Sequence, residues 1–413
     1  MLERTIIRAT CDRGLAPWLE REVAALGYAV AGTDETGVEI EGGMRDAMRL
    51  CLHLRTAHNV LVQFAEFHCD GPEDLYDGLR ALAWEEVLDP AERLCVVSRV
   101  DHPSIRNWNI ANLKAKDAIV DRVAARAGRR PDSGPERAGA VVVNVYWKDR
   151  LCRVYLNASG EKLADRGYRR RPHTAPMRET LAAGALIAAG YDGAAPLVNP
   201  MCGSGTLAIE AALIALRRAP GSLRGGFGFM RLKRFDGRHW RDLCGEARAS
   251  EIAAPPAPIV ASDIDPKAVE TARKNAAAAG VERFITFHVC DFAETPLPSR
   301  GTRTDTDTHG PINPAPSPAL IILNPEYGER LGRAAELETT YARIGDFFKQ
   351  RGQGWTGCVF TGNLALARKI GLHPRRRVPF FNAAIECRLL EYELYPGSRK
   401  PGSQTSPAPP ESR

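Results

Sequence analysis

The sequence predicts an α/β protein, with a doubly wound parallel sheet in its C-terminal half and a smaller α+β region before it. From about residue 175 onward, apolar strand-like runs alternate with longer helical patterns, which is typical of a parallel sheet covered by helices. A glycine-rich turn joins a strand to an apolar helix at 196–212. Acidic or amide residues follow three later strands, as in proteins that bind a ligand at the carboxyl ends of a parallel sheet.

Composition excludes several classes of protein. The 413 residues are 44% hydrophobic and 26% charged, which is ordinary for a soluble protein of two or three domains. No apolar run approaches the roughly 18 residues that cross a bilayer, and charges at 3–8 interrupt any signal peptide. The 10 cysteines form no C-x-x-C pair. We therefore expect a cytoplasmic protein with reduced thiols, no bound metal and no membrane contact. The net charge of +6 permits a polyanionic partner without requiring one.

Three units and a tail are expected. Residues 1–65 form a small α+β unit, with strands at 4–10 and 38–41 and helices at 15–26 and 44–54. Residues 66–165 form a second unit, with helices at 73–84 and 112–127, a strand at 94–100 and a hairpin at 140–156. Residues 166–395 form the α/β domain, interrupted by an insertion at 220–258 that is rich in glycine, arginine and aromatic residues. The stretches 299–318 and 396–413 read as disordered.

The glycine-rich turn is the first candidate binding element. Glycines let a backbone turn sharply and bring its N–H groups close to a ligand, although such a turn can also be purely structural. There is no Gly-Lys-Ser/Thr, so an NTPase phosphate loop is not indicated. We interpret Cys202 within the turn as a packing residue and not as a nucleophile. The residues predicted here to contact a cofactor are Asn199, Met201, Gly203 and Gly205.

The next two strand ends suggest a nucleoside. Asp263 can accept both hydroxyls of a ribose, with Ile264 beside it, whereas Asp265 reads as a helix cap. Asp291 can accept an exocyclic amine and Phe292 can flank a purine ring; taken alone, the two could also be a solvated acid and a core aromatic.

The strand at 319–323 ends in Asn324, Pro325 and Tyr327, and this ending suggests the chemistry. The lone pair of an exocyclic amine on a base is delocalised into the ring. The side-chain oxygen of Asn324 and the carbonyl of Pro325 can accept its two N–H bonds and pull the nitrogen toward tetrahedral geometry. Tyr327 can then stack on an extruded base.

Together with these motifs, the segments 9–15, 116–122, 157–169 and 175–183 give the sequence a specific resemblance. Over about residues 1–395 it resembles the THUMP-domain RNA guanine-N2 methyltransferases, in particular the bacterial group that acts on 23S ribosomal RNA of the large subunit. The resemblance implies a ferredoxin-like unit (1–65), a THUMP RNA-binding module (66–165) and a class I, Rossmann-like methyltransferase domain (166–395) that uses S-adenosyl-L-methionine (SAM). Some relatives carry a second methyltransferase domain, and this chain is expected to be the single-domain form.

Two positions depart from the pattern of that family. Asn199 stands where an aspartate is usual, so a charge that would pair with the ammonium group of SAM is missing, and weaker cofactor binding is expected. Glu326 stands where a second proline is usual. Its carboxylate can accept the N1–H of a guanine, or it can point to solvent.

Basic residues form three clusters, which the resemblance makes candidate RNA contacts. The residues predicted to bind RNA are Arg169, Arg170 and Arg171, Arg224, and Arg375 and Arg376. The expected partner is 23S ribosomal RNA, in the large subunit or an assembly intermediate of it, and no obligate protein partner is inferred. The alternatives are a tRNA guanine N2 or an adenine N6 as the target, or an RNA-binding assembly factor without activity.

Overall fold

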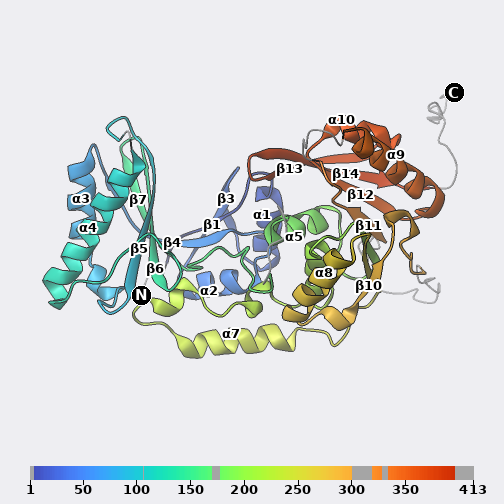
Figure 1. Cartoon of the computed structure of the whole chain (residues 1–413). Helices are drawn as coiled ribbons and strands as arrows, with labels where there is room; N and C mark the ends of the chain where they lie inside the picture. Colours follow the sequence, from blue (N-terminus) through green and yellow to red (C-terminus); the bar gives the residue numbers. More distant parts are fainter. Residues whose placement is uncertain (1–3, 106, 170–176, 300–318, 328–333, 396–413) are drawn as a thin grey trace, which may run out of the picture.

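The computed structural model describes residues 4–105, 107–169, 177–299, 319–327 and 334–395. Two seven-stranded sheets dominate an elongated molecule, in which α3 and α4 lie at one end and the second sheet at the other (Figure 1). Apart from residue 299, the stretches expected to be disordered lie outside these ranges. The predicted α/β class is confirmed.

The first sheet runs through both N-terminal units in the order β2-β3-β1-β4-β7-β6-β5. Its strands are β1 (Thr5–Thr10), β2 (Val30–Asp34), β3 (Gly37–Gly42), β4 (Asn59–His68), β5 (Arg93–Asp101), β6 (Ala140–Lys148) and β7 (Leu151–Asn157). The sequence did not predict β2 or β4. Because β4 pairs with β1 on one side and with β7 on the other, the expected boundary at 65/66 falls inside a strand that the two units share.

Four helices cover this sheet, and their ends follow local rules. They are α1 (Ala16–Ala25), α2 (Met44–His53), α3 (Pro72–Ala81) and α4 (Trp108–Ala127). At the start of α2 the Asp46 carboxylate accepts the Gly43 N–H at 2.8 Å, which satisfies a donor that the helix leaves free. Gly128 ends α4 with a left-handed φ of 67°, a conformation that glycine adopts without steric cost.

The second sheet has the order β10-β9-β8-β11-β12-β14-β13. Its strands are β8 (Leu197–Pro200), β9 (Ile259–Asp263), β10 (Ile285–Val289), β11 (Leu320–Leu323), β12 (Thr356–Thr361), β13 (Arg376–Asn382) and β14 (Ile385–Glu393). All pairs from β10 through β12 are parallel, whereas β14 is antiparallel to both β12 and β13. Its helices are α5 (Glu179–Ala188), α6 (Thr206–Ala215), α8 (Pro266–Ala278), α9 (Ala334–Arg351) and the short α10 (Leu364–Ala367).

The insertion at 220–258 contains one long helix, α7 (Gly237–Ala249), which lies along the lower side of the molecule in Figure 1. Asp236 caps α7 by accepting the His239 N–H at 3.0 Å, and it also pairs with Arg45 of α2 at 2.8 Å. The insertion therefore contacts the N-terminal unit.

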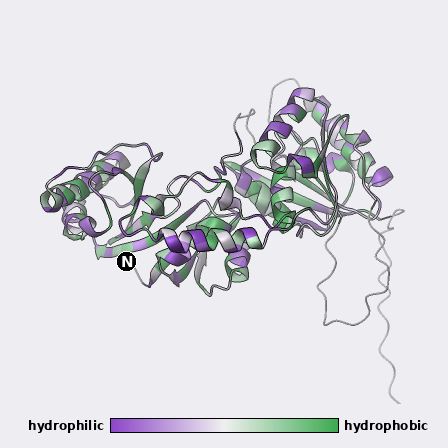
Figure 2. Ribbon diagram, turned by 90° about the horizontal axis from the view of Figure 1, so that it is seen from below, coloured by the Kyte–Doolittle hydropathy of each residue, from purple (hydrophilic) through white to green (hydrophobic). Residues whose placement is uncertain are grey.

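Apolar residues concentrate in the strands and in the helix faces that contact them, with hydrophilic residues on the outer helix faces (Figure 2). Helices α5 and α6 are rich in alanine and are buried over nearly their whole length. Among the described residues, no helix has both the length and the apolar character needed to span a membrane. The same residues contain no group of three or more His, Cys, Asp or Glu arranged to hold a metal ion.

Candidate active site

The predicted site segments meet at one edge of the second sheet. Strands β10, β9, β8 and β11 are parallel neighbours, so their carboxyl ends share that edge. The chain passes from β8 to β9 on one side, whereas β11 lies on the other side of β8. The chain therefore reverses direction across the sheet at β8 and β11. Open α/β sheets bind ligands at such a switch point, outside the carboxyl ends of the two strands.

The glycine turn after β8 has two differently used glycines. A Cβ at Gly205, where φ is 83°, would come within 2.9 Å of the Ala272 Cβ on α8, so this glycine permits helix packing. A Cβ at Gly203 would meet nothing within 4 Å, so the backbone here faces open space. The neighbouring Met201 also has a positive φ of 54°. The Cys202 thiol is buried and its pKa is raised by that burial, so it is not poised to attack.

Asp263 holds this turn in place. Its two carboxylate oxygens accept the N–H groups of Gly203, at 2.9 Å, and of Asp265, at 3.0 Å. Asp265 caps α8 by accepting the Lys267 N–H at 2.9 Å, as predicted. The Ile264 side chain is 70% exposed at this strand end, an unusual position for a large apolar group. The turn and β9 thus offer an exposed apolar surface beside a carboxylate.

After β10, the described residues engage Asp291 through one carboxylate oxygen. Its Oδ1 accepts the Ala293 N–H at 2.9 Å and pairs with Arg343 of α9 at 2.8 Å. The Arg343 guanidinium also lies 4.9 Å from the centre of the Phe292 ring. Among the described residues nothing donates to Asp291 Oδ2. The sequence did not single out Arg343, because its role depends on the packing of α9 against a distant strand end.

At the end of β11, the Asn324 Oδ1 is buried and has no hydrogen-bond partner among the described residues. A buried acceptor without a donor costs about 1–3 kcal/mol, so this oxygen is available to a donor that the described residues do not supply. Pro325 beside it is buried, and Glu326 is exposed.

Tyr327 is fixed from two sides. Its hydroxyl accepts a hydrogen bond from Asn382 Nδ2 at 3.0 Å, and its ring lies so close to Gly362 that a Cβ there would approach it to 2.9 Å. Burial raises the pKa of Tyr327 to about 12, so the phenol stays neutral and acts through its ring and hydroxyl.

Three models of known protein families match parts of the chain. A model of the RMKL-like methyltransferase domain matches residues 166–391, more than half of the chain. The chain belongs to this family. Models of the RlmL ferredoxin-like domain and of the THUMP domain match residues 7–61 and 71–157.

Individual relatives also match over most of this chain. The ribosomal RNA large subunit methyltransferase K/L of Syntrophotalea carbinolica is 36% identical over 94% of this chain, but the match covers 53% of that protein. The chain thus spans about half the length of these relatives. A Synechocystis protein named as an RNA methyltransferase is 33% identical, with 94% of this chain and 96% of that protein covered. The crystal structure of SMU.472, described as a methyltransferase complexed with SAH, has a TM-score of 0.81 at 25% identity and covers 97% of this chain and 100% of its own.

Asn199, one of the two departures from the family pattern, is fully buried. Its Nδ2 donates to the Ile322 carbonyl of β11 at 2.9 Å, which ties the two strands together at the switch point. Its Oδ1 is buried without a partner among the described residues. The amide therefore has a structural role in the sheet that the sequence did not reveal.

We expect Asn199→Asp to destabilise the protein, although it introduces the residue usual in the family. A carboxylate oxygen would replace the donor that faces the Ile322 carbonyl, and leaving that buried acceptor unpaired costs about 1–3 kcal/mol. Thermal unfolding without ligand measures the effect, with the exposed Asn109→Asp as control. An unchanged melting temperature for Asn199→Asp would contradict this reading of the amide.

The arginines predicted to bind RNA are mostly engaged within the chain. Arg169 is largely buried and donates to Glu179 at 2.9 Å and to Thr206 Oγ1 at 3.0 Å. Its guanidinium is thus largely engaged within the chain, and its role in RNA binding stays a prediction. Arg375 and Arg376 both pair with the buried Glu391, at 2.6 and 3.1 Å, and remain half exposed. Arg170 and Arg171 lie outside the described residues.

Arg224 is likewise structural. Its guanidinium donates to four backbone carbonyls, those of Ser159, Glu161, Lys162 and Asp165, at 2.7–3.4 Å. It also lies 5.1 Å from the centre of the Phe227 ring. From the sequence, Arg224 was assigned to a basic cluster predicted to bind RNA. Its actual contacts could not be predicted, because the four carbonyls belong to a loop that is far from Arg224 along the chain.

Proposed function

We propose that the chain is a SAM-dependent RNA methyltransferase that acts on the exocyclic N2 of a guanine in 23S ribosomal RNA. The observation that carries the proposal is the buried Asn324 Oδ1 at the carboxyl end of β11, which no described residue satisfies and which lies at the same sheet edge as the open glycine turn. Family membership supports methyl transfer, and the names of the relatives support ribosomal RNA of the large subunit, or an assembly intermediate of it, as substrate. Such a substrate implies a cytoplasmic protein.

The residues around the turn fit SAM. Open space at Gly203 allows the backbone to approach a ligand, and Asp263 lies at the position where an acid accepts ribose hydroxyls. The exposed Ile264 offers an apolar surface to a purine, and Asp291 Oδ2 can accept its amine. When bound, SAM supplies a sulfonium methyl group to the attacking nitrogen.

The chain's own task is to hold the amine. The Asn324 oxygen and the Pro325 carbonyl accept the two N–H bonds of the guanine amine and direct its lone pair away from the ring. Tyr327, fixed by Asn382 and Gly362, supports the extruded base. Glu326 is exposed next to this group and can take the proton that the product nitrogen releases, or pass it to water.

Two measurements test the proposal. Calorimetry with SAM tests cofactor binding, and absence of binding would favour an RNA-binding assembly factor. Incubation with SAM and deproteinised large-subunit RNA, followed by mapping of the modified nucleotide, tests the target atom. We expect N2-methylguanine in 23S RNA. A methylated adenine N6, or methylation of tRNA alone, would overturn the assignment, since Asn324 could also hold those amines.

We expect Asp291→Asn to change which purine the cofactor site prefers. The Asn oxygen can keep the Ala293 contact, while its NH2 group replaces Oδ2 and would face the adenine amine donor to donor. Losing a hydrogen bond to a charged group costs about 1.5–3 kcal/mol, or at least tenfold in affinity for SAH. An inosine analogue of SAH carries an acceptor at the same ring position and should bind the variant better than wild type. Equal weakening of both ligands would show that Asp291 does not face the purine.

A further inference from the structure

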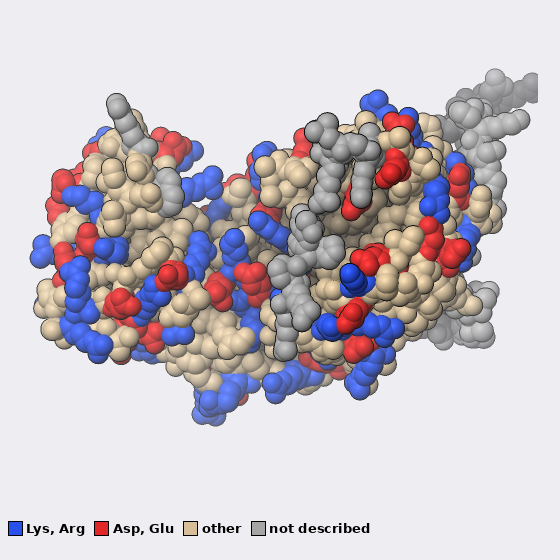
Figure 3. Space-filling view, viewed as in Figure 1, with Lys and Arg blue, Asp and Glu red and all other residues tan. Residues whose placement is uncertain are grey.

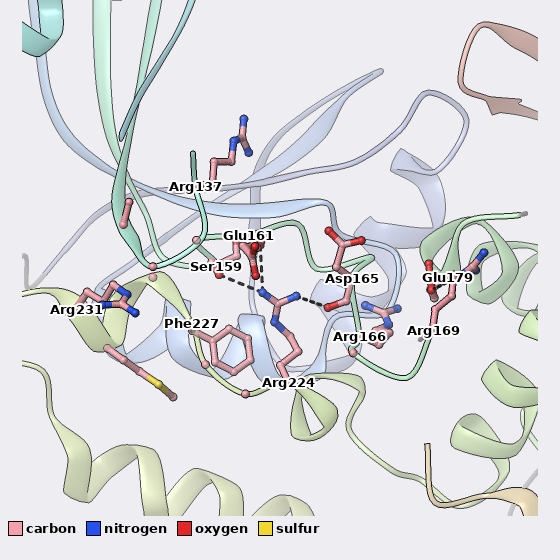
Figure 4. A pocket seen from close by; sticks show the side chains of 18 of the residues that line it. Arg137, Ser159, Glu161, Asp165, Arg166, Arg169, Glu179, Arg224, Phe227 and Arg231 are labelled. Carbon is pink, nitrogen blue, oxygen red and sulfur yellow. Dashed lines mark hydrogen bonds and ion pairs between the residues drawn. The ribbon is translucent and has the colours of Figure 1, made fainter. Parts of the chain in front are cut away.

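A cavity of about 950 Å³ is lined by the THUMP half, the segment after β7, the start of α5 and the insertion, and by none of the site residues at the strand ends. We call it the junction pocket; Figure 4 shows its walls, with Arg137, Arg224 and Arg231 labelled, and Arg178 and Gly225 also line it. Its volume is at the upper end of the roughly 300–1,000 Å³ typical of ligand sites. The pocket is larger than a single small anion requires.

The floor of the junction pocket is preformed. Arg224 fastens the segment 159–165 to the insertion through its four carbonyl contacts, drawn as dashed lines in part in Figure 4. Gly160 and Gly228 pack so closely that a Cβ on Gly160 would lie 2.9 Å from the Gly228 nitrogen. A ligand would therefore meet a rigid surface and lose little affinity to ordering it.

Cationic groups remain available on the walls. The side chain of Arg137, a half-buried residue, makes no hydrogen bond or ion pair with any residue in the described part of the chain. Among the described residues Arg231 forms an ion pair with Glu92 alone, at 2.9 Å, and it keeps 42% of its side chain exposed. Arg178 pairs with Asp12, at 3.1 Å, and keeps 38% exposed. A Cβ on Gly225 would meet nothing within 4 Å, so the backbone there is open to a ligand.

The balance of charge indicates the class of ligand. Six arginines and four carboxylates line the pocket, and Figure 3 shows basic side chains with acidic ones among them at the waist of the molecule. Glu161 and Asp165 are exposed, and within the described ranges neither side chain forms an ion pair. Guanidinium groups suit phosphates, whereas carboxylates accept from the N–H groups of base edges. In RNA those edges are accessible chiefly where bases are unpaired.

We propose that the junction pocket is a second RNA-binding site, which holds an unpaired stretch of the substrate by its phosphates, apart from the methyl-transfer site. The proposal rests on the proposed function for the identity of the substrate. Arg137 and Arg231 contact phosphates, and the carboxylates of Glu161 and Asp165 accept from base edges. The site would anchor the RNA while the target guanine reaches Asn324.

The test measures RNA binding by fluorescence anisotropy, without SAM, using a short unstructured oligoribonucleotide and a duplex of the same length. We expect Arg137→Glu to weaken single-strand binding by about tenfold or more. Arg137→Ala should lower the slope of log affinity against log salt by about 0.7, the value for one phosphate contact on a single strand. Arg283→Glu makes the same charge change on an exposed residue next to the amino end of β10 and is the control.

A second pair of variants does not depend on an arginine. Gly225→Glu places a carboxylate in the pocket without a clash, and Gly225→Gln fills the same space without charge. We expect the Glu variant to bind single-stranded RNA more weakly than the Gln variant. Loss of affinity no greater than that of Arg283→Glu, or equal loss for duplex and single strand, would overturn the proposal. Arg137-dependent binding by a protein that methylates no RNA would instead refute the proposed function alone.

Discussion

Replacing Asn324 by alanine should slow methyl transfer to RNA by about 10²–10³-fold, the usual effect of removing one preoriented hydrogen-bond partner of a transition state. The side chain lies at the end of β11 with a buried oxygen that no described residue satisfies. A substrate amine could supply the donor that the described residues do not. Cofactor affinity should remain near that of wild type, because the glycine turn, Asp263 and Asp291 are untouched.

The measurement combines single-turnover methylation of large-subunit RNA with calorimetry of SAH binding. Asn382→Ala is the informative comparison, since it removes the contact that fixes the Tyr327 hydroxyl but leaves the acceptor of the amine in place. We expect it to be less impaired than Asn324→Ala. A wild-type rate for Asn324→Ala would rule out the assigned mechanism, and a parallel loss of SAH binding would mean that Asn324 supports the cofactor instead.

Sequence alone was sufficient for the elements whose signals are local. The turn at 200–205 and the cap at Asp265 need only a few neighbouring residues to be recognised, and both occur where expected. Strand β4 was missed because what defines it is not local. Its apolar run at 60–62 is short, and its pairing partners β1 and β7 are separated from it along the chain, as in the register of Leu61 with Asn157.

The sequence predicted least well which charged side chains are buried and paired within the protein. Arg169 lies in a run of arginines that suggests a surface for RNA, yet it is held by Glu179. Glu179 and Glu210 are the only acids in the two alanine-rich helices α5 and α6. A single carboxylate within an apolar helix must be paired when that helix is buried. These two glutamates were thus the available signal that some of the nearby arginines were internal.

The strongest effect on stability should come from Glu210, which is fully buried. Its Oε1 accepts the Tyr168 hydroxyl at 3.0 Å and lies 3.6 Å from Arg166 Nε. Arg166 is itself only 1% exposed and donates to the carbonyls of Leu163 and Arg55. Burial lowers the pKa of Arg55, and the nearby Glu210 carboxylate opposes that shift. The Glu210 carboxylate thus offsets two buried positive charges. They belong to Arg55 in the N-terminal unit and to Arg166 in the segment leading into α5.

Glu210→Ala should therefore cost about 3–5 kcal/mol of unfolding free energy, because removing one partner of a buried ion pair leaves the other charge uncompensated. Glu210→Gln keeps an acceptor for Tyr168 but not the charge, so it separates the two contributions. We expect most of the loss in both variants, measured by denaturant and thermal unfolding. Glu282→Ala, which removes a half-exposed partner of Arg273 at 3.8 Å, should change stability by less than about 1 kcal/mol. If Glu210→Gln were as stable as wild type, charge compensation would not be what joins these parts of the molecule, and the hydrogen bond to Tyr168 would account for the burial of Glu210.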